Sequence, residues 1–157
     1  MSLQTDIIFV KAIQSDATLL GMLPAGDVYN TTIALPDEDL DNAQVPYVIV
    51  SYNGLNNDPS TKDDYEGDTD TVTIGIQVTG RTRPELGVIA KRIRKAIRRF
   101  FTSPEETDEC REMIPYDYQF SASQVSYDPL KPCYWQTLTY QCDVMNDTED
   151  EEEDDEG

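Results

Sequence analysis

The sequence predicts a single α+β domain, with a mixed, mostly antiparallel sheet packed by one long and one or two short helices. Three observations support this. The segment Thr71–Thr79 alternates strictly between apolar and polar residues, as a half-buried strand does. An amphipathic helix to about Phe101 follows it directly. Two β-type segments then flank a proline-containing turn, and 157 residues suit one domain.

The N-terminal part is predicted to be helical. Leu3–Gln14 has Leu3, Ile7, Val10 and Ile13 at steps of three and four residues, which predicts one apolar helix face. Asp16 is a candidate cap for a second short helix that ends near Leu23. A short strand is expected at 27–29, followed by a polar loop over 31–43.

Val45–Tyr52 is predicted to be a strand with apolar side chains on both faces, which indicates burial on both sides or an interface on one. Asn53–Asp70 is polar, lacks apolar anchors and is predicted to be a long exposed loop; whether it orders on assembly stays open. Its acids do not follow the ligand order of an EF-hand, so a solvated loop is favoured over a calcium site. They are Asp58, Asp63, Asp64, Glu66, Asp68 and Asp70.

The long helix has clear start and packing signals. Thr82-Arg83-Pro84-Glu85 has the form of a capping box with proline in the first turn. The predicted apolar stripe consists of Leu86, Ile89, Ala90, Ile93, Ala96, Ile97 and Phe100. Ser103-Pro104 is expected to end the helix.

Two late strands complete the predicted sheet. Pro115–Tyr127 and Cys133–Val144 are expected to form an antiparallel hairpin around the turn at 128–132. Trp135 points away from the face that carries Tyr134 and Leu138. Its own face is either covered by a helix or contacts a partner, since tryptophan and tyrosine are enriched at interfaces.

A basic face of the long helix is the sharpest functional candidate. Its members are Lys91, Arg92, Arg94, Lys95, Arg98 and Arg99, which are half of the 12 basic residues. Three interpretations stay open: a solvated helix face, contact with an acidic protein surface such as a neighbouring copy, or contact with DNA. The candidate interface residues are Arg94, Arg98, Lys91, Lys95, Trp135, Asp63 and Asp64.

The charge balance is strongly acidic. The chain carries 31 acidic residues against 12 basic ones, a formal net charge of -19, which disfavours sequence-specific binding to a phosphate backbone. Much of the excess lies in Asp147–Glu156. We therefore expect a folded domain over 1–145 and a disordered acidic tail over 146–157, which adds solubility or engages a basic partner.

Several function classes are disfavoured by what the sequence lacks. It has no histidine, so Ser-His-Asp and Cys-His catalysis cannot arise within this chain. Cys110, Cys133 and Cys142 show no metal-binding spacing, and phosphate-loop and nucleophile motifs are missing. We predict a protein that is not an enzyme and uses no cofactor or metal. A signal peptide and an apolar run of roughly 20 residues are also missing, so we expect an intracellular protein without a membrane span.

The order of these segments resembles a known family. Pro46-Tyr47-Val48-Ile49-Val50 is followed by a polar loop, by Thr71–Thr79 running into Arg81-Thr82-Arg83, by the helix with Ile89–Arg94, and by two strands. Over about Leu3–Val144 this is similar to the tail completion, or tail terminator, proteins of long-tailed phages and prophages. That family has no catalytic residues to carry over.

The resemblance implies a mixed sheet packed by helices and a ring of subunits, usually a hexamer, that caps the tail tube and joins it to the head connector. DNA would pass through the lumen without specific binding, and the protein would reside at the tail–head junction of the virion after assembly in the host cytoplasm. Two alternatives remain: another neck or head-closure protein of the same particle, or a nucleic-acid-binding module that uses the basic helix face.

Overall fold

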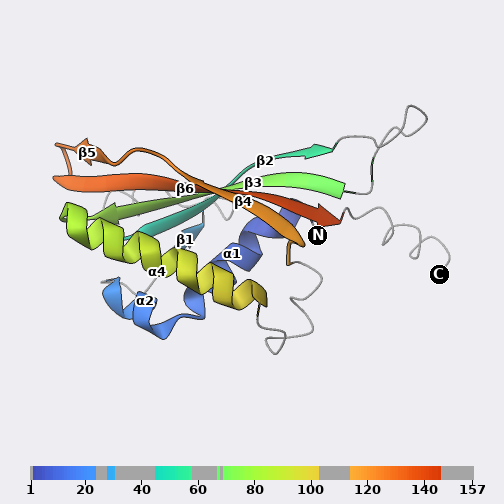
Figure 1. The fold of residues 1–157 in the computed structure, drawn as a ribbon. Helices are drawn as coiled ribbons and strands as arrows, with labels where there is room; N and C mark the ends of the chain where they lie inside the picture. The colour runs from blue at the N-terminus through green and yellow to red at the C-terminus, as the bar shows by residue number, and fades with distance from the viewer. Residues whose placement is uncertain are drawn as a thin grey trace.

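The computed structural model describes residues 2–23, 28–30, 45–57, 67, 69–102 and 114–145 (Figure 1). Its helices are the 3-10 turn η1 (Ser2–Gln4), α1 (Thr5–Gln14), α2 (Ala17–Met22) and α4 (Arg83–Thr102). Its strands are β1 (Val28–Asn30), β2 (Val48–Asn57), β3 (Thr69–Gly80), β4 (Asp117–Ala122), β5 (Ser126–Asp128) and β6 (Cys133–Met145). The acidic segment 146–157 lies outside the described residues.

The strands form one six-stranded sheet in the order β1-β2-β3-β6-β4, with β5 also paired to β6. β1 runs parallel to β2, and every other pairing is antiparallel. The predicted α+β class, with a mostly antiparallel sheet and one long and two short helices, is therefore confirmed.

The helices lie on one face of the sheet, and the opposite face carries no described helix (Figure 1). β3 shows why the sheet has one apolar face. Val72, Ile74, Ile76 and Val78 are fully buried against the helices, while Thr71, Thr73 and Gln77 point the other way and are half-buried. The strict alternation of the sequence thus sets the orientation of the central strand, as predicted.

α4 begins as the sequence predicts. The backbone N–H of Glu85 donates to Oγ1 of Thr82 at 3.2 Å, which provides the first half of the capping box. The Glu85 carboxylate turns away to Arg81, whose Nε donates to it at 3.3 Å. The predicted stripe is confirmed: Leu86, Ile89, Ile93, Ala96, Ile97 and Phe100 are buried, and Ala90 is half-buried.

The predicted apolar face of α1 is confirmed for Ile13, which is fully buried, but not for its other members. Leu3 is 68% exposed, and Ile7 and Val10 are only half-buried. The buried side chains are instead Thr5, Asp6, Ile8, Phe9, Ala12 and Ile13. The helix contacts α4, β1 and β2 together, so a wider sector is buried than a single three-and-four stripe covers.

The predicted loop over Asn53–Asp70 is also corrected. β2 extends to Asn57 and β3 begins at Thr69, so both ends of that range belong to the sheet. A bulge between Tyr52 and Gly54 shifts the register, and Gly54 has φ 146°, which only glycine adopts readily.

Polar contacts hold this end of the sheet together. The Asn57 amide donates to Oδ1 of Asp70 at 2.7 Å and accepts from the backbone N–H of Gly67 at 2.7 Å. Backbone pairing needs no apolar anchor, which is why the polar composition misled the sequence prediction.

The predicted strand Pro115–Tyr127 is divided into β4 and β5. Ser123 stands at the break and replaces regular ladder bonds with its side chain. Its Oγ accepts from the backbone N–H of Thr137 at 3.0 Å, while its own N–H donates to the carbonyl oxygen of Thr137 at 2.9 Å. The hairpin with β6 and its turn at 129–132 are confirmed.

Candidate interaction surface on helix α4

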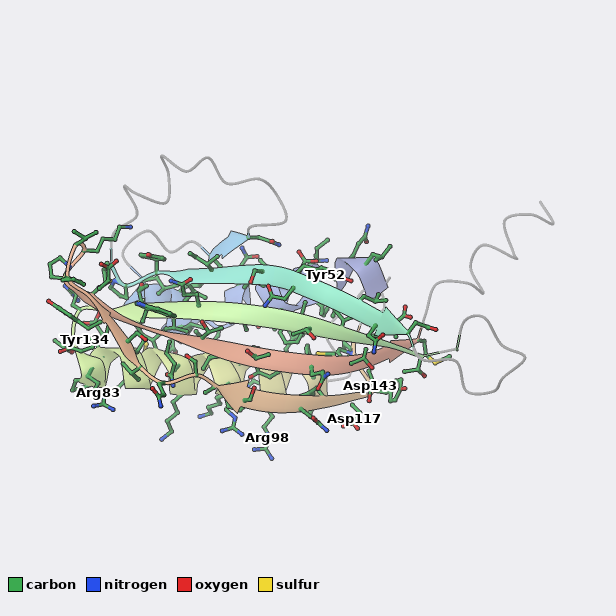
Figure 2. All side chains as sticks on the ribbon, turned by 90° about the horizontal axis from the view of Figure 1, so that it is seen from above. Tyr52, Arg83, Arg98, Asp117, Tyr134 and Asp143 are labelled. Atoms are coloured by element: carbon green, nitrogen blue, oxygen red, sulfur yellow. The ribbon has the colours of Figure 1, made fainter. Side chains whose placement is uncertain are left out.

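The exposed flank of α4 carries a line of cations. Lys91, Arg94, Lys95 and Arg98, here called the basic row, are all exposed and recur at steps of three and four residues, which places them on one side of the helix. Figure 2 shows Arg83 and Arg98 projecting from α4 at the same edge of the sheet as Asp117 of β4. Four of the predicted interface residues are therefore brought together on one surface.

Arg94 is held in place by an aromatic ring. Its guanidinium carbon lies 4.0 Å from the centre of the Phe120 ring of β4, within the range of a cation–π contact. Such a contact leaves the N–H groups on the outer side of the guanidinium available for hydrogen bonding. The basic row is thus fixed to the edge strand at its centre and does not consist of unrestrained side chains alone.

Arg98 opens onto a groove between the end of α4 and the start of β4. The groove has a volume of about 580 Å³. Its walls are Arg94, Arg98, Phe101, Thr102, Pro115, Tyr116, Asp117 and Tyr118. Phe101 and Tyr118 meet edge to face with ring centres 5.9 Å apart, so the groove walls combine packed aromatic rings with the cations of Arg94 and Arg98.

Arg92 does not belong to this exposed surface, although the sequence prediction grouped it with the other cations. Its Nε donates to Oδ2 of Asp16 at 2.9 Å, and its Nη2 donates to Oδ1 at 3.1 Å. Asp16 is buried and also accepts from the backbone N–H of Leu19, so it caps α2 as predicted. The spacing contained a signal, since Arg92 lies one turn from both Ile89 and Ala96 of the buried stripe.

Trp135 lies on the other side of the sheet. It pairs with Thr79 of β3 on the face away from the helices, and it is half-buried. The option that a helix covers this face is wrong for the described residues. Trp135 and the basic row therefore do not form one site. Asp63 and Asp64, the remaining predicted interface residues, lie outside the described residues.

The face around Trp135, here called the polar face, is rich in hydroxyl and amide side chains. The ladder registers place on it Ser51, Thr71, Thr73, Gln77, Thr137, Thr139 and Gln141. At its end near β4, Asp117 and Asp143 are direct cross-strand neighbours, and Thr71 donates to Oδ1 of Asp143 at 3.1 Å. The polar face is thus neutral along most of its length and acidic at one end.

Two buried polar side chains at β1, Asp6 and Asn30, have a structural explanation, because they are hydrogen-bonded to each other. Asp6 is 1% exposed and accepts a hydrogen bond from the Asn30 amide at 3.1 Å. Burial raises the pKa of Tyr52 nearby, and the charges of Asp70 and Asp6 raise it further. The described residues contain no group of three or more acidic or cysteine side chains placed to hold a metal ion.

Comparisons with known proteins give no family. No protein-family model matches this sequence. A search of curated proteins finds no match either. Among the described residues, no helix combines the length and apolar character needed to cross a bilayer.

Proposed function

We propose that this chain is a structural subunit of a tailed phage or prophage, which forms a ring that caps the tail tube and joins it to the head connector. The ring is a homo-oligomer, with six copies as the stoichiometry implied by the resemblance. In this proposal the chain acts through the shape and charge of its surface and catalyses no reaction. Its location would be the tail–head junction of the virion.

The observation that carries the proposal is the uneven distribution of charge. Lys91, Arg94, Lys95 and Arg98 gather exposed positive charge on one flank of a chain whose formal net charge is -19. A basic patch on an otherwise acidic subunit suits a head-to-tail contact, in which the patch of one copy meets acidic surface of the next. Repetition of such a contact closes a ring when the rotation per subunit divides a full turn.

The fold supports the same interpretation. The polar face, on which no described helix lies, and the cationic flank are on different sides of the subunit, so a ring could use one for its neighbours and offer the other to the tube or the connector. An acidic balance around a lumen would repel DNA, which would let the genome pass without specific binding.

A nucleic-acid-binding module is the second candidate, and the exposed cations of α4 favour it. Phosphate contacts by these side chains would give binding that weakens steeply as salt rises. Measurement of affinity for a double-stranded DNA of arbitrary sequence over a range of salt concentrations separates the two candidates. The assembly proposal expects no binding by the full chain at physiological ionic strength.

Native mass spectrometry of the full chain, with light scattering after size exclusion, tests the ring. The wild type is expected to show a closed oligomer of one defined size. The variant Lys91→Glu with Lys95→Glu is expected to lose it, because both side chains are exposed and reversal of their charge repels an acidic neighbour.

Arg83→Glu is the matched control. Arg83 is equally exposed on α4 but lies at the far end of the helix from Arg98 (Figure 2). An oligomer that survives reversal at Lys91 and Lys95 would contradict a role for the basic row in the ring. A chain that stays monomeric at every concentration would contradict self-assembly itself.

A further inference from the structure

We infer that the polar face binds a second copy of this chain, and that the two copies pack face to face about a two-fold axis that crosses the strands. This contact goes beyond the proposed ring, because the ring contact uses the basic row on a different side of the subunit. Three features support it: the area of the polar face, the two acidic side chains at one end, and the match between opposite ends.

The polar face has the area that a stable contact needs. β3 contains 12 residues and β6 contains 13. At about 3.3 Å per residue and about 4.8 Å between strands, four strands of this length cover roughly 750 Å². Stable interfaces bury about 800 Å² on each partner. No described helix lies on this face, which Figure 2 shows from above.

The acidic end of the polar face selects one of two orientations. Two identical sheets that pack face to face are related by a two-fold axis that runs either along the strands or across them. An axis along the strands would place Asp117 and Asp143 of both copies at the same end, where four carboxylates would repel one another. An axis across the strands places the acidic end of each copy on the opposite end of the other. Figure 2 shows this separation, with Tyr134 at one end of the sheet and both aspartates at the other.

The middle of the polar face suits close approach. Thr139 lies at the centre of β6 and pairs with Gly75 of β3 on one side and with Ser121 of β4 on the other. Ser51 of β2 completes this row of small residues. A Cβ on Gly75 would lie 2.6 Å from the amide nitrogen of Asn53, so the space above this glycine holds a hydrogen-bonding group. An axis across the strands at this row brings Thr139 of one copy against Thr139 of the other.

The same axis brings donors onto acceptors. Trp135 and Asp143 lie four residues on either side of Thr139, so the indole of each copy meets Asp143 of the other. The indole N–H only donates and an ionised carboxylate only accepts, which makes this a charge-assisted hydrogen bond that the symmetry repeats. Asp117, in the row of Asp143, likewise meets the hydroxyl of Ser126, which lies in the row of Trp135. Both acidic side chains thus find donors in this orientation.

The remaining groups of the polar face match themselves. On β6, Thr137 of one copy meets Gln141 of the other, and on β3, Thr73 meets Gln77. Hydroxyl groups and primary amides both donate and accept, so each pair can replace the hydrogen bonds that the displaced water made. Trp135 is half-buried and adds aromatic area near both ends of the contact. The result is a reversible dimer whose population depends on concentration.

Under the proposed function, a tail tube or connector that binds the polar face has to displace the second copy first. That role rests on the proposed function, whereas the dimer itself can be measured without the ring. The background for the measurement is the full-length Lys91→Glu, Lys95→Glu variant, in which the ring contact through the basic row is removed.

Sedimentation equilibrium of this variant is expected to show monomers and dimers in exchange. Addition of Thr139→Arg is expected to abolish the dimer, because a long cation at the axis would meet its own copy. Addition of Val88→Arg is the matched control, since Val88 is 56% exposed on α4, and it is expected to leave the dimer unchanged. A monomer at every concentration, or a dimer that survives Thr139→Arg, would overturn the contact. Both results would leave the ring proposal standing.

Two cysteine variants test the axis and do not depend on the folding of the arginine variant. In a Cys110→Ser background, Thr139→Cys is expected to give a disulfide-linked dimer under mild oxidation. Thr71→Cys is the control, because its thiol would meet Thr79 of the other copy, eight residues or about 26 Å along the strand from the second thiol. An axis along the strands would allow both links. Non-reducing electrophoresis that shows equal linking by the two variants would therefore contradict the axis across the strands.

Discussion

Arg92 and Asp16, 76 positions apart in the sequence, form a two-bond ion pair that joins α4 to the start of α2, with Nε 2.9 Å from Oδ2 and Nη2 3.1 Å from Oδ1. The side chain of Asp16 is 4% exposed and that of Arg92 is 23% exposed. The same carboxylate caps α2 through the backbone N–H of Leu19. One side chain thus fixes both the beginning of a short helix and its position against the long one.

Asp16→Ala is expected to lower the free energy of unfolding by about 2–4 kcal/mol, because it removes a helix cap and leaves the mostly buried Arg92 without its partner. Asp16→Asn is expected to cost less, since an amide oxygen can still accept from Leu19. Urea unfolding followed by circular dichroism measures both. Equal stability of the wild type and the alanine variant would contradict the structural role of this pair.

The same pair makes stability depend on pH. Burial acts to raise the pKa of Asp16, but hydrogen bonds from Arg92 and from the backbone of Leu19, with the charge of Arg92, outweigh it and hold the pKa below its ordinary value of 3.8. The stabilisation is therefore fully present above that ordinary value. It is lost as pH falls through the lower pKa of the folded state.

The stability difference between the wild type and Asp16→Asn is thus expected to shrink as pH falls below 3.8, the ordinary pKa of this carboxyl group, and through its lower pKa in the folded state. Urea unfolding at several pH values measures this difference. A constant difference over this range would show that the charge of Asp16 does not contribute.

Two glycines give a matched pair of substitutions. A Cβ on Gly80 would lie 2.8 Å from the backbone nitrogen of Leu86, which cannot move without shifting the first turn of α4, so Gly80→Ala is expected to destabilise the fold. Gly87 lies inside α4, and a Cβ there meets no atom within 4 Å. Gly87→Ala is expected to stabilise the protein by about 0.5–1 kcal/mol, because alanine restricts the unfolded chain. Shifts of the thermal midpoint in opposite directions are the expected result.

The cysteines of β6 are expected to resist alkylation in the folded protein. Cys133 and Cys142 are both buried, and burial raises the pKa of each thiol. For Cys142, burial and the nearby charge of Asp143 raise the pKa to about 12. At about pH 8 the thiolate that reacts with iodoacetamide is therefore scarce at both sites. Mass spectrometry of individual sites is expected to find slow labelling that accelerates in urea. Rapid labelling of Cys142 without denaturant would contradict its position in the core.

Local sequence patterns were sufficient to predict the elements whose apolar residues follow a single strand or helix period. Val72 to Val78 alternate on a half-buried strand, and Leu86 to Phe100 follow one helical stripe, so both orientations could be derived from spacing alone. α1 could be derived only in part in this way, because the helix contacts α4, β1 and β2 at once and buries a wider sector than one stripe. Nor could the extension of β2 to Asn57, which depends on amide and backbone hydrogen bonds with the partner strand.

The candidate site was predictable only in part. The sequence grouped the cations of α4 correctly as a helix face, since Lys91, Lys95 and Arg98 need only helical spacing to coincide. The spacing of Arg92 from Ile89 and Ala96 signalled that it belongs beside the buried stripe, but its ion pair with Asp16 could not be predicted, because the two residues are distant in sequence. The aromatic part of the groove wall likewise depends on the packing of Phe101 against Tyr118, which only the tertiary structure defines.

The polar face has a consequence for how tightly any molecule can adhere to this protein. Hydroxyl and amide groups such as those of Thr73, Thr137 and Gln141 form hydrogen bonds with water. A binding partner that displaces this water therefore gains little binding free energy unless it offers donors and acceptors at matching positions. We expect apolar surfaces to bind this face weakly. A surface with matching hydrogen-bonding groups would bind selectively and could still dissociate. Such a surface favours specificity of binding over high affinity.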